Sequence, residues 1–155
     1  MSFITNRTQG DVARHRELAR KGFANMTDTE RAEWLAPSKG AYNYHDLNRV
    51  EEGVEKLTTY LNAMGRADGL YPTRRWTAAD RITPVEMERY LRNIKTIRAA
   101  LPEMHHLMPA APASMQHLTY EGANAIEEIL SLAMTFAESK VQTFPFLGEI
   151  YGGET

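Results

Sequence analysis

Histidine and acidic side chains are the first candidates for chemistry in this chain, because both can bind a metal ion or move a proton. Three histidines lie close together in one proline-rich stretch: His105, His106 and His117. Their spacing matches no known metal-binding pattern, and adjacent side chains in an extended loop point to opposite sides of the backbone. Glu103 is the only carboxylate suitably near them. The sequence therefore predicts no metal site, and we expect no cofactor.

The acidic clusters are candidates for general acid–base catalysis. Glu51, Glu52 and Glu55 form one cluster, and Glu127 with Glu128 forms another. Each cluster shares a predicted helix with apolar residues at the inward positions, so we expect these carboxylates on solvated faces and none inside an apolar stripe. An enzyme that acts on carbohydrate or peptidoglycan, one alternative for the function, would require such a buried carboxylate.

Motifs for nucleophilic catalysis and phosphate binding are absent. The chain contains no G-x-S-x-G, no G-x-x-x-x-G-K-[ST] and no G-x-G-x-x-G sequence. It also contains no cysteine, which excludes disulfides and thiolate chemistry. These observations favour a non-enzymatic protein.

A basic group spans Arg74–Arg98 and is the best candidate for binding nucleic acid. Its members are Arg74, Arg75, Arg81, Arg89, Arg92, Lys95 and Arg98. Asp80, Glu86 and Glu88 interrupt it, and the alternative role for these residues is in salt bridges between helices or subunits. A nucleic-acid-binding or regulatory helical module is therefore the second hypothesis for the function, and nucleic acid is not the partner we expect.

Five large aromatic residues lie in or beside predicted loops rather than on a helical stripe: Trp34, Tyr42, Tyr44, Tyr71 and Trp76. Such rings commonly close the open end of a helical bundle, but tryptophan and tyrosine also anchor protein interfaces. Both roles stay open, and the core role is favoured. As candidates for partner binding we name Tyr42, Tyr44, Tyr71 and Trp76.

These residues are positioned by helices, because capping signals and apolar periodicity recur along the chain. The predicted caps are Thr8, Thr27, Asn43 or His45, Thr83 and Thr119, and the predicted helix ends lie near Gly22, Pro37, Gly65, Pro102 and Lys140. One stripe contains Leu47, Val50, Val54, Leu57, Leu61 and Met64. The sequence predicts an all-α fold, a small bundle of about four to five helices joined by two irregular connections, Arg66–Arg81 and 102–118.

Size and composition suit a single folded domain. The chain has 155 residues, of which 43% are hydrophobic and 25% charged, so it can bury a core. The formal net charge of -2 implies no particular partner. The N-terminus lacks the apolar core of a signal peptide, and no run approaches the roughly 20 apolar residues of a membrane span. We expect synthesis in the cytoplasm and no membrane partner.

The last residues differ from the rest of the chain. After Lys140 the sequence VQTFPFLGEIYGGET combines β-formers, one proline and a glycine pair. We interpret 1–141 as a helical domain and 142–155 as an extended tail that docks on its own body or on a partner. The residues expected to anchor it are Phe144, Phe146, Leu147, Ile150 and Tyr151.

Several segments in order carry a resemblance to a known group of proteins. They are NRTQGDVARHRELARKGFANMTDTERAEWL, GAYNYHDLNRVEEGVEKL, TPVEMERYLRNIKTIRAALP and SMQHLTYEGANAIEEIL, followed by the ending FLGEIYGGE. Together they resemble small proteins encoded among the tail genes of bacteriophages and prophages of Gram-positive bacteria, including minor tail and tail-tip proteins.

The resemblance implies a structural role without an active site. It implies a place in the virion, at the tail tip, baseplate or receptor-binding apparatus, for a protein made in the host bacterial cytoplasm. The expected partners are other tail proteins and further copies of this chain in a symmetric oligomer. The loop aromatics are the second choice for an interface, either with the host surface or with an adjacent tail protein.

Overall fold

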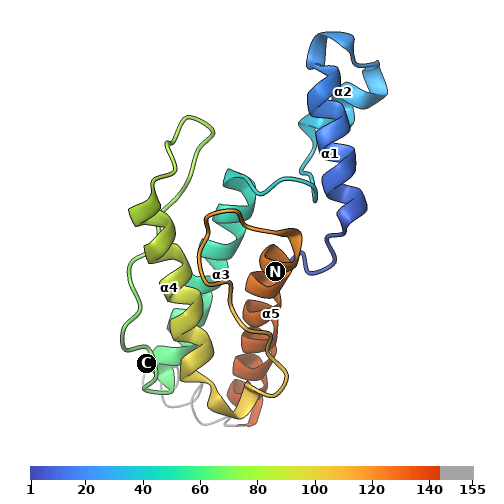
Figure 1. Cartoon of the computed structure of the whole chain (residues 1–155). Coiled ribbons are helices and arrows are strands. Elements are labelled where there is room, and N and C mark those ends of the chain that lie inside the picture. The colour runs from blue at the N-terminus through green and yellow to red at the C-terminus, as the bar shows by residue number, and fades with distance from the viewer. Residues whose placement is uncertain (144–155) are drawn as a thin grey trace, which may run out of the picture.

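The structure is a computed structural model, and it describes residues 1–143 (Figure 1). Those residues form five α-helices and no strand, which confirms the all-α prediction. The bounds are α1 Gln9–Lys21, α2 Asp28–Leu35, α3 Tyr44–Ala63, α4 Pro84–Ala100 and α5 Tyr120–Thr143, with short 3-10 turns at Phe23–Asn25 and Pro102–Met104. The first two residues of the predicted tail, 142 and 143, belong to α5, and 144–155 lie outside the described residues.

Local capping explains where the helices begin. The side chains of Thr8 and Thr27 accept hydrogen bonds from the backbone of Asp11 and Glu30, whose carboxylates bind back to form complete capping boxes. Asn43, and not His45, caps α3. Four of the five predicted caps are confirmed: Thr8, Thr27, Thr83 and Thr119. For the fifth cap, which the sequence left open between two residues, the structure shows Asn43.

Helices α3, α4 and α5 form the body of the molecule, and all three run in the same direction (Figure 1). Two irregular connections, 64–83 and 101–119, return the chain to the starting end each time. The core lies between the apolar stripes of these helices. Its fully buried members include Leu47, Val50, Val54, Leu57, Leu61, Tyr90, Ile94, Ile97, Ile126, Ile129 and Leu130.

Helices α1 and α2 form a helical hairpin, the arm (residues 9–35), which projects from the N-terminal ends of the body helices (Figure 1). Two charged pairs join its helices: Arg14 with Glu33 at 2.8 Å and Lys21 with Glu30 at 2.7 Å. The His15 ring stacks on Trp34 with centroids 4.9 Å apart. Trp34 therefore packs inside the arm and does not close the core of the body.

The chain crosses between arm and body twice, just before α1 and just before α3. Gly40 lies on the second crossing, against the backbone of α1. A Cβ atom at Gly40 would stand 2.2 Å from the Asp11 carbonyl oxygen and 2.6 Å from the His15 Cβ. Glycine is required here because only a residue without a side chain allows the two segments to approach so closely.

Within the described residues, no helix has both the length and the apolar character that crossing a membrane requires.

Candidate interaction site

A buried charge network joins the N-terminal segment to two body helices. The Arg7 Nη2 atom lies 2.9 Å from the Asp46 Oδ1 atom on α3 and 2.6 Å from the Glu127 Oε1 atom on α5. Arg49 donates from Nε and Nη2 to the two oxygens of Glu127, at 2.8 and 2.7 Å. Two arginines thus balance two carboxylates, which is the condition for keeping charges inside a protein.

The network corrects the expectation that the carboxylates lie on solvated faces. Glu127 is 0% exposed and Glu51 is 1% exposed, although both belong to clusters expected in solvent. Glu127 is buried because Arg7, 120 residues away in sequence, supplies its counter-charge. Apolar periodicity shows where a helix faces its own core, but it does not show a distant segment that covers a polar position.

A second buried pair joins α3 to α4. Arg89 donates to both oxygens of Glu51, and the Trp76 indole Nε1–H donates to Glu51 Oε1 at 3.3 Å. Trp76 is 3% exposed, so it belongs to the core of the body. The sequence offered salt bridges between helices as one role for the basic group, and this role is confirmed for Arg89.

The two tyrosines Tyr42 and Tyr90 lie beside these charges, with their hydroxyl oxygens 2.5 Å apart. Burial raises the pKa of both phenols above the ordinary value, so both are neutral at physiological pH. The Arg7 guanidinium lies over the Tyr42 ring, 5.4 Å from its centroid. For Arg49, burial opposes the charged form, but the hydrogen bonds that it donates to Glu127 and Asp46 outweigh burial and raise the pKa of the guanidinium.

Glu127 has no oxygen available for a substrate. Its Oε1 accepts from Arg7 and Arg49, and its Oε2 accepts from Arg49 and from the Ile4 backbone N–H at 2.7 Å. A general acid or base has to reach the proton that it transfers. A fully enclosed carboxylate held by four donors fits a structural role, and it fixes the N-terminal segment to α5.

Three asparagines, one on each body helix, hold the irregular segments in place. Each side-chain amide accepts from the backbone N–H of a distant residue and donates to its C=O, a two-bond contact that we call an asparagine clamp. Asn48 holds Trp76, Asn93 holds Tyr71, and Asn124 holds Arg7, with distances of 2.7–3.1 Å. These residues were not predicted from the sequence, because an asparagine in a helix carries no signal of its distant partner.

The candidate partner-binding residues fall into different environments. Trp76 is buried, Tyr42 is half-buried with its hydroxyl on Tyr90, and half-buried Tyr44 packs on the His45 ring at 4.0 Å. Tyr71 is 44% exposed. The structure therefore does not bring the four together as one surface. The tail candidates Phe144, Phe146, Leu147, Ile150 and Tyr151 lie outside the described residues.

Tyr71 combines exposure with a fixed position. Asn93 holds its backbone, and the Arg92 guanidinium lies over its ring, 5.5 Å from the centroid, and donates to its hydroxyl at 3.0 Å. An exposed ring that is already ordered loses little entropy when a partner covers it. Among the four loop aromatics, Tyr71 has the environment best suited to an interface.

Most of the basic group is engaged within the molecule. Arg74 lies over the Trp76 ring at 4.0 Å and pairs with Asp80, and Arg75 pairs with Glu55 at 2.8 Å. Lys95 and Arg98 donate to backbone carbonyls of the connection between α4 and α5. These contacts compete with phosphate for the same donors, so they weigh against a continuous phosphate-binding stripe.

The histidines do not gather. His105 Nε2 lies 2.7 Å from the Arg98 carbonyl oxygen, whereas His117 lies at the other end of the same connection with a positive φ of 56°. In the part of the chain that the structure describes, no three side chains from His, Asp and Glu are arranged to hold a metal ion.

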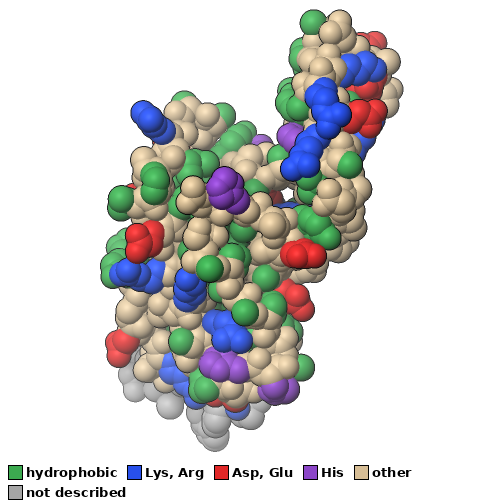
Figure 2. All heavy atoms as spheres, in the orientation of Figure 1, with side chains coloured by type: hydrophobic (Ala, Val, Ile, Leu, Met, Phe, Trp, Pro, Cys, Tyr) green, Lys and Arg blue, Asp and Glu red, His purple; other side chains and the backbone are tan. Residues whose placement is uncertain are grey.

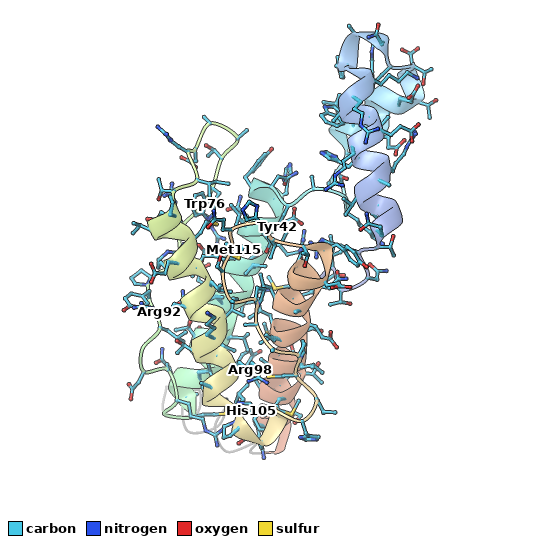
Figure 3. All side chains as sticks on the ribbon, in the orientation of Figure 1. Tyr42, Trp76, Arg92, Arg98, His105 and Met115 are labelled. Carbon is cyan, nitrogen blue, oxygen red and sulfur yellow. The ribbon has the colours of Figure 1, made fainter. Side chains whose placement is uncertain are left out.

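Among the open depressions on the surface of the described chain, two have similar volumes. One, of about 700 Å³, lies where the arm meets the body, between residues of α1, the second crossing and the start of α5. The other, of about 690 Å³, lies along α4 and is closed on its second side by residues 113–116; we call it the α4 groove. Figure 3 labels Arg92 and Met115, which come from its two walls.

Comparison with protein-family models, with curated proteins and with solved structures gives no match. The described residues present three exposed features: a projecting arm, an ordered exposed tyrosine and an apolar groove.

Proposed function

We propose that this chain is a non-enzymatic structural component of a phage or phage-like tail, in the tail tip, baseplate or receptor-binding apparatus. It acts by binding other tail proteins and copies of itself. The resemblance of its sequence to small tail-associated proteins supports the proposal. The observation that carries it is the arm, a helical hairpin that stands off from the body and touches it mainly at its base (Figure 2).

The arm exposes apolar side chains that its own fold does not cover. Phe23, in the turn between the two helices, is 47% exposed, and Leu35, at the end of α2, is 73% exposed. Scattered apolar residues are normal on a surface, but a projecting hairpin has little core of its own. In an assembly, these side chains would be buried against a neighbouring subunit.

The base of the arm is attached through buried polar contacts, which suits a docking element. Arg7 lies just before α1, whereas Tyr42 and Asp46 lie at the start of α3, so the buried charge network holds both crossings. A pre-ordered element loses less conformational entropy on binding than a mobile one. The network is thus assigned a positioning role in assembly.

Incorporation into particles tests the proposal. Particles produced by cells that encode the chain would be purified by density and size, and the chain would be detected with an epitope tag. We expect the wild-type chain to sediment with the particles. We expect the variants Phe23→Asp and Leu35→Asp to remain folded, as judged by circular dichroism, but to be lost from them.

The matched control for these variants is Val85→Asp, which changes a 75% exposed apolar residue at the start of α4, on the body. It should remain in the particle. A wild-type chain that is absent from purified particles and sediments alone would refute the proposed function.

A further inference from the structure

The α4 groove is an apolar surface without a partner among the described residues. Ile82 is 49% exposed, and Met87, Leu91 and Met115 continue the apolar lining. The groove lies between α4 and the returning connection, with Pro84 at one end and Lys95 at the other. An elongated apolar channel of this kind fits an extended peptide or a short helix better than a small polar ligand.

The rim of the groove is mainly basic. Arg92 and Lys95 line it, and Glu88 is the one carboxylate among its lining residues. The segment 144–155, with the sequence FPFLGEIYGGET, contains Glu149 and Glu154 and no lysine or arginine. Its apolar residues match the lining, and its charge is opposite to that of Arg92 and Lys95. Complementary charge of this type sets the orientation of a bound segment.

The geometry of the body limits how far the two phenylalanines of the segment can reach within their own copy. The pairs Arg89–Glu51 and Arg49–Glu127 join both residues to the same turn of α3, so Arg89 and Glu127 lie within about one side-chain length of the same level of the bundle. Because α5 continues sixteen residues beyond Glu127, its last residue, Thr143, lies about 24 Å below that level at 1.5 Å per residue. Leu91, in the middle of the groove, is only about 3 Å below Arg89.

A chain of three residues spans at most about 11 Å, even when fully extended. Phe146 therefore falls well short of the roughly 20 Å that separates the end of α5 from Leu91 in the same copy. In their own copy, Phe144 and Phe146 therefore cannot reach Leu91 or the more distant Ile82, whereas the same residues of another molecule can.

We propose that the α4 groove binds residues 144–155 of a second copy of this chain. The inference rests on the proposed function, since it names the partner of the docking tail. Each copy then offers one tail and one groove, so the contact is head-to-tail. Such contacts produce a closed ring if the rotation closes and a filament if it does not.

Two variants of the full-length chain test the groove and the tail separately. Ile82→Glu places a charge in the groove, and Phe146→Glu places one in the tail. Val85→Glu is the control, because Val85 is 75% exposed on the same helix start but is not among the residues that line the groove. All four proteins would be measured by light scattering over a range of concentrations.

We expect the wild-type chain and Val85→Glu to form oligomers, and Ile82→Glu and Phe146→Glu to be monomers. The deciding measurement is an equal mixture of the two monomeric variants. One intact groove and one intact tail remain between them, so the mixture should form 1:1 dimers and nothing larger. Each variant would be checked by circular dichroism, so that loss of folding is not read as loss of contact.

A monomeric wild-type chain, an oligomer that survives Ile82→Glu, or a mixture that yields no dimer would each overturn the inference. These results would leave the proposed function standing, because incorporation into particles is measured separately. If instead the chain is absent from particles but the mixture forms dimers, the tail function fails and the contact between copies stands.

Discussion

The side-chain amide of Asn93 on α4 holds the backbone of Tyr71 by two hydrogen bonds. Its Oδ1 accepts from the Tyr71 N–H at 2.8 Å, and its Nδ2 donates to the Tyr71 C=O at 3.1 Å. Asn93 is fully buried, whereas the Tyr71 side chain is 44% exposed. A core residue thus orders an exposed aromatic ring, and the connection between α3 and α4 is fixed where it displays that ring.

Replacement of Asn93 by aspartate tests this clamp. The Asn93→Asp variant loses the donor to the Tyr71 carbonyl and places a carboxylate in the core, so we expect a loss of about 1–3 kcal/mol in the free energy of unfolding. Urea denaturation measures it, and amide exchange at Tyr71 should accelerate. Asn62→Asp, on the exposed face of α3, is the control; an equal loss there would contradict the clamp.

Glu127 and Glu128 provide a matched pair for the buried charge network. Glu127→Gln leaves Arg7 and Arg49 with Asp46 as their one charged partner, in a site where Arg7 is buried and Arg49 only partly exposed, and we expect it to destabilise the protein by about 3–5 kcal/mol. Glu128→Gln, one residue on and exposed, should change stability by less than about 0.5 kcal/mol. Thermal and urea unfolding measure both. Similar stabilities for the two variants would show that the network is not important for folding.

Gly40 and Gly10 should respond to alanine with opposite signs. Gly40→Ala forces a Cβ to within 2.2 Å of the Asp11 carbonyl oxygen, and overpacking of this kind destabilises by about 1–3 kcal/mol. In Gly10→Ala the nearest atom is 3.5 Å away and the residue is helical, so a gain of about 0.5–1 kcal/mol is expected. Amide exchange in α1 would show whether the arm loosens. Unchanged exchange in Gly40→Ala would mean that the base of the arm tolerates a side chain.

The arm should weaken in acid. The Lys21 ammonium hydrogen bond, followed by the Thr27 backbone N–H, lowers the pKa of Glu30 from 4.5 to about 2. A carboxylate with a lowered pKa stabilises the folded arm above its unfolded pKa, and that contribution disappears as the pH falls from about 4.5 to about 2. NMR titration of the Glu30 carboxyl carbon measures the pKa directly. Lys21→Ala should return it toward 4.5, and an unchanged titration would exclude Lys21 as the cause.

Much of the secondary structure could be predicted because its determinants are local. The cap residue Thr83 and the following Pro84 start α4 where the sequence indicated, and the stripe from Leu47 to Leu61 is buried as expected. The candidate site was harder to predict. Trp76 was one of five loop aromatics with two open roles, and its place in the core depends on Asn48 and Glu51, which lie on another element.

By itself, the sequence determined that residues 1–143 form helices and no strands, and it located the caps of four of the five α-helices, since caps and stripes depend on contacts within about four residues. Only the tertiary structure decided that three helices run parallel, that α1 and α2 project as an arm, and that Glu51 and Glu127 are buried. The physical reason is that a carboxylate can be buried only if a counter-charge pairs with it. Arg7 pairs with Glu127 and Arg89 pairs with Glu51, and these partners are 120 and 38 residues apart in the sequence.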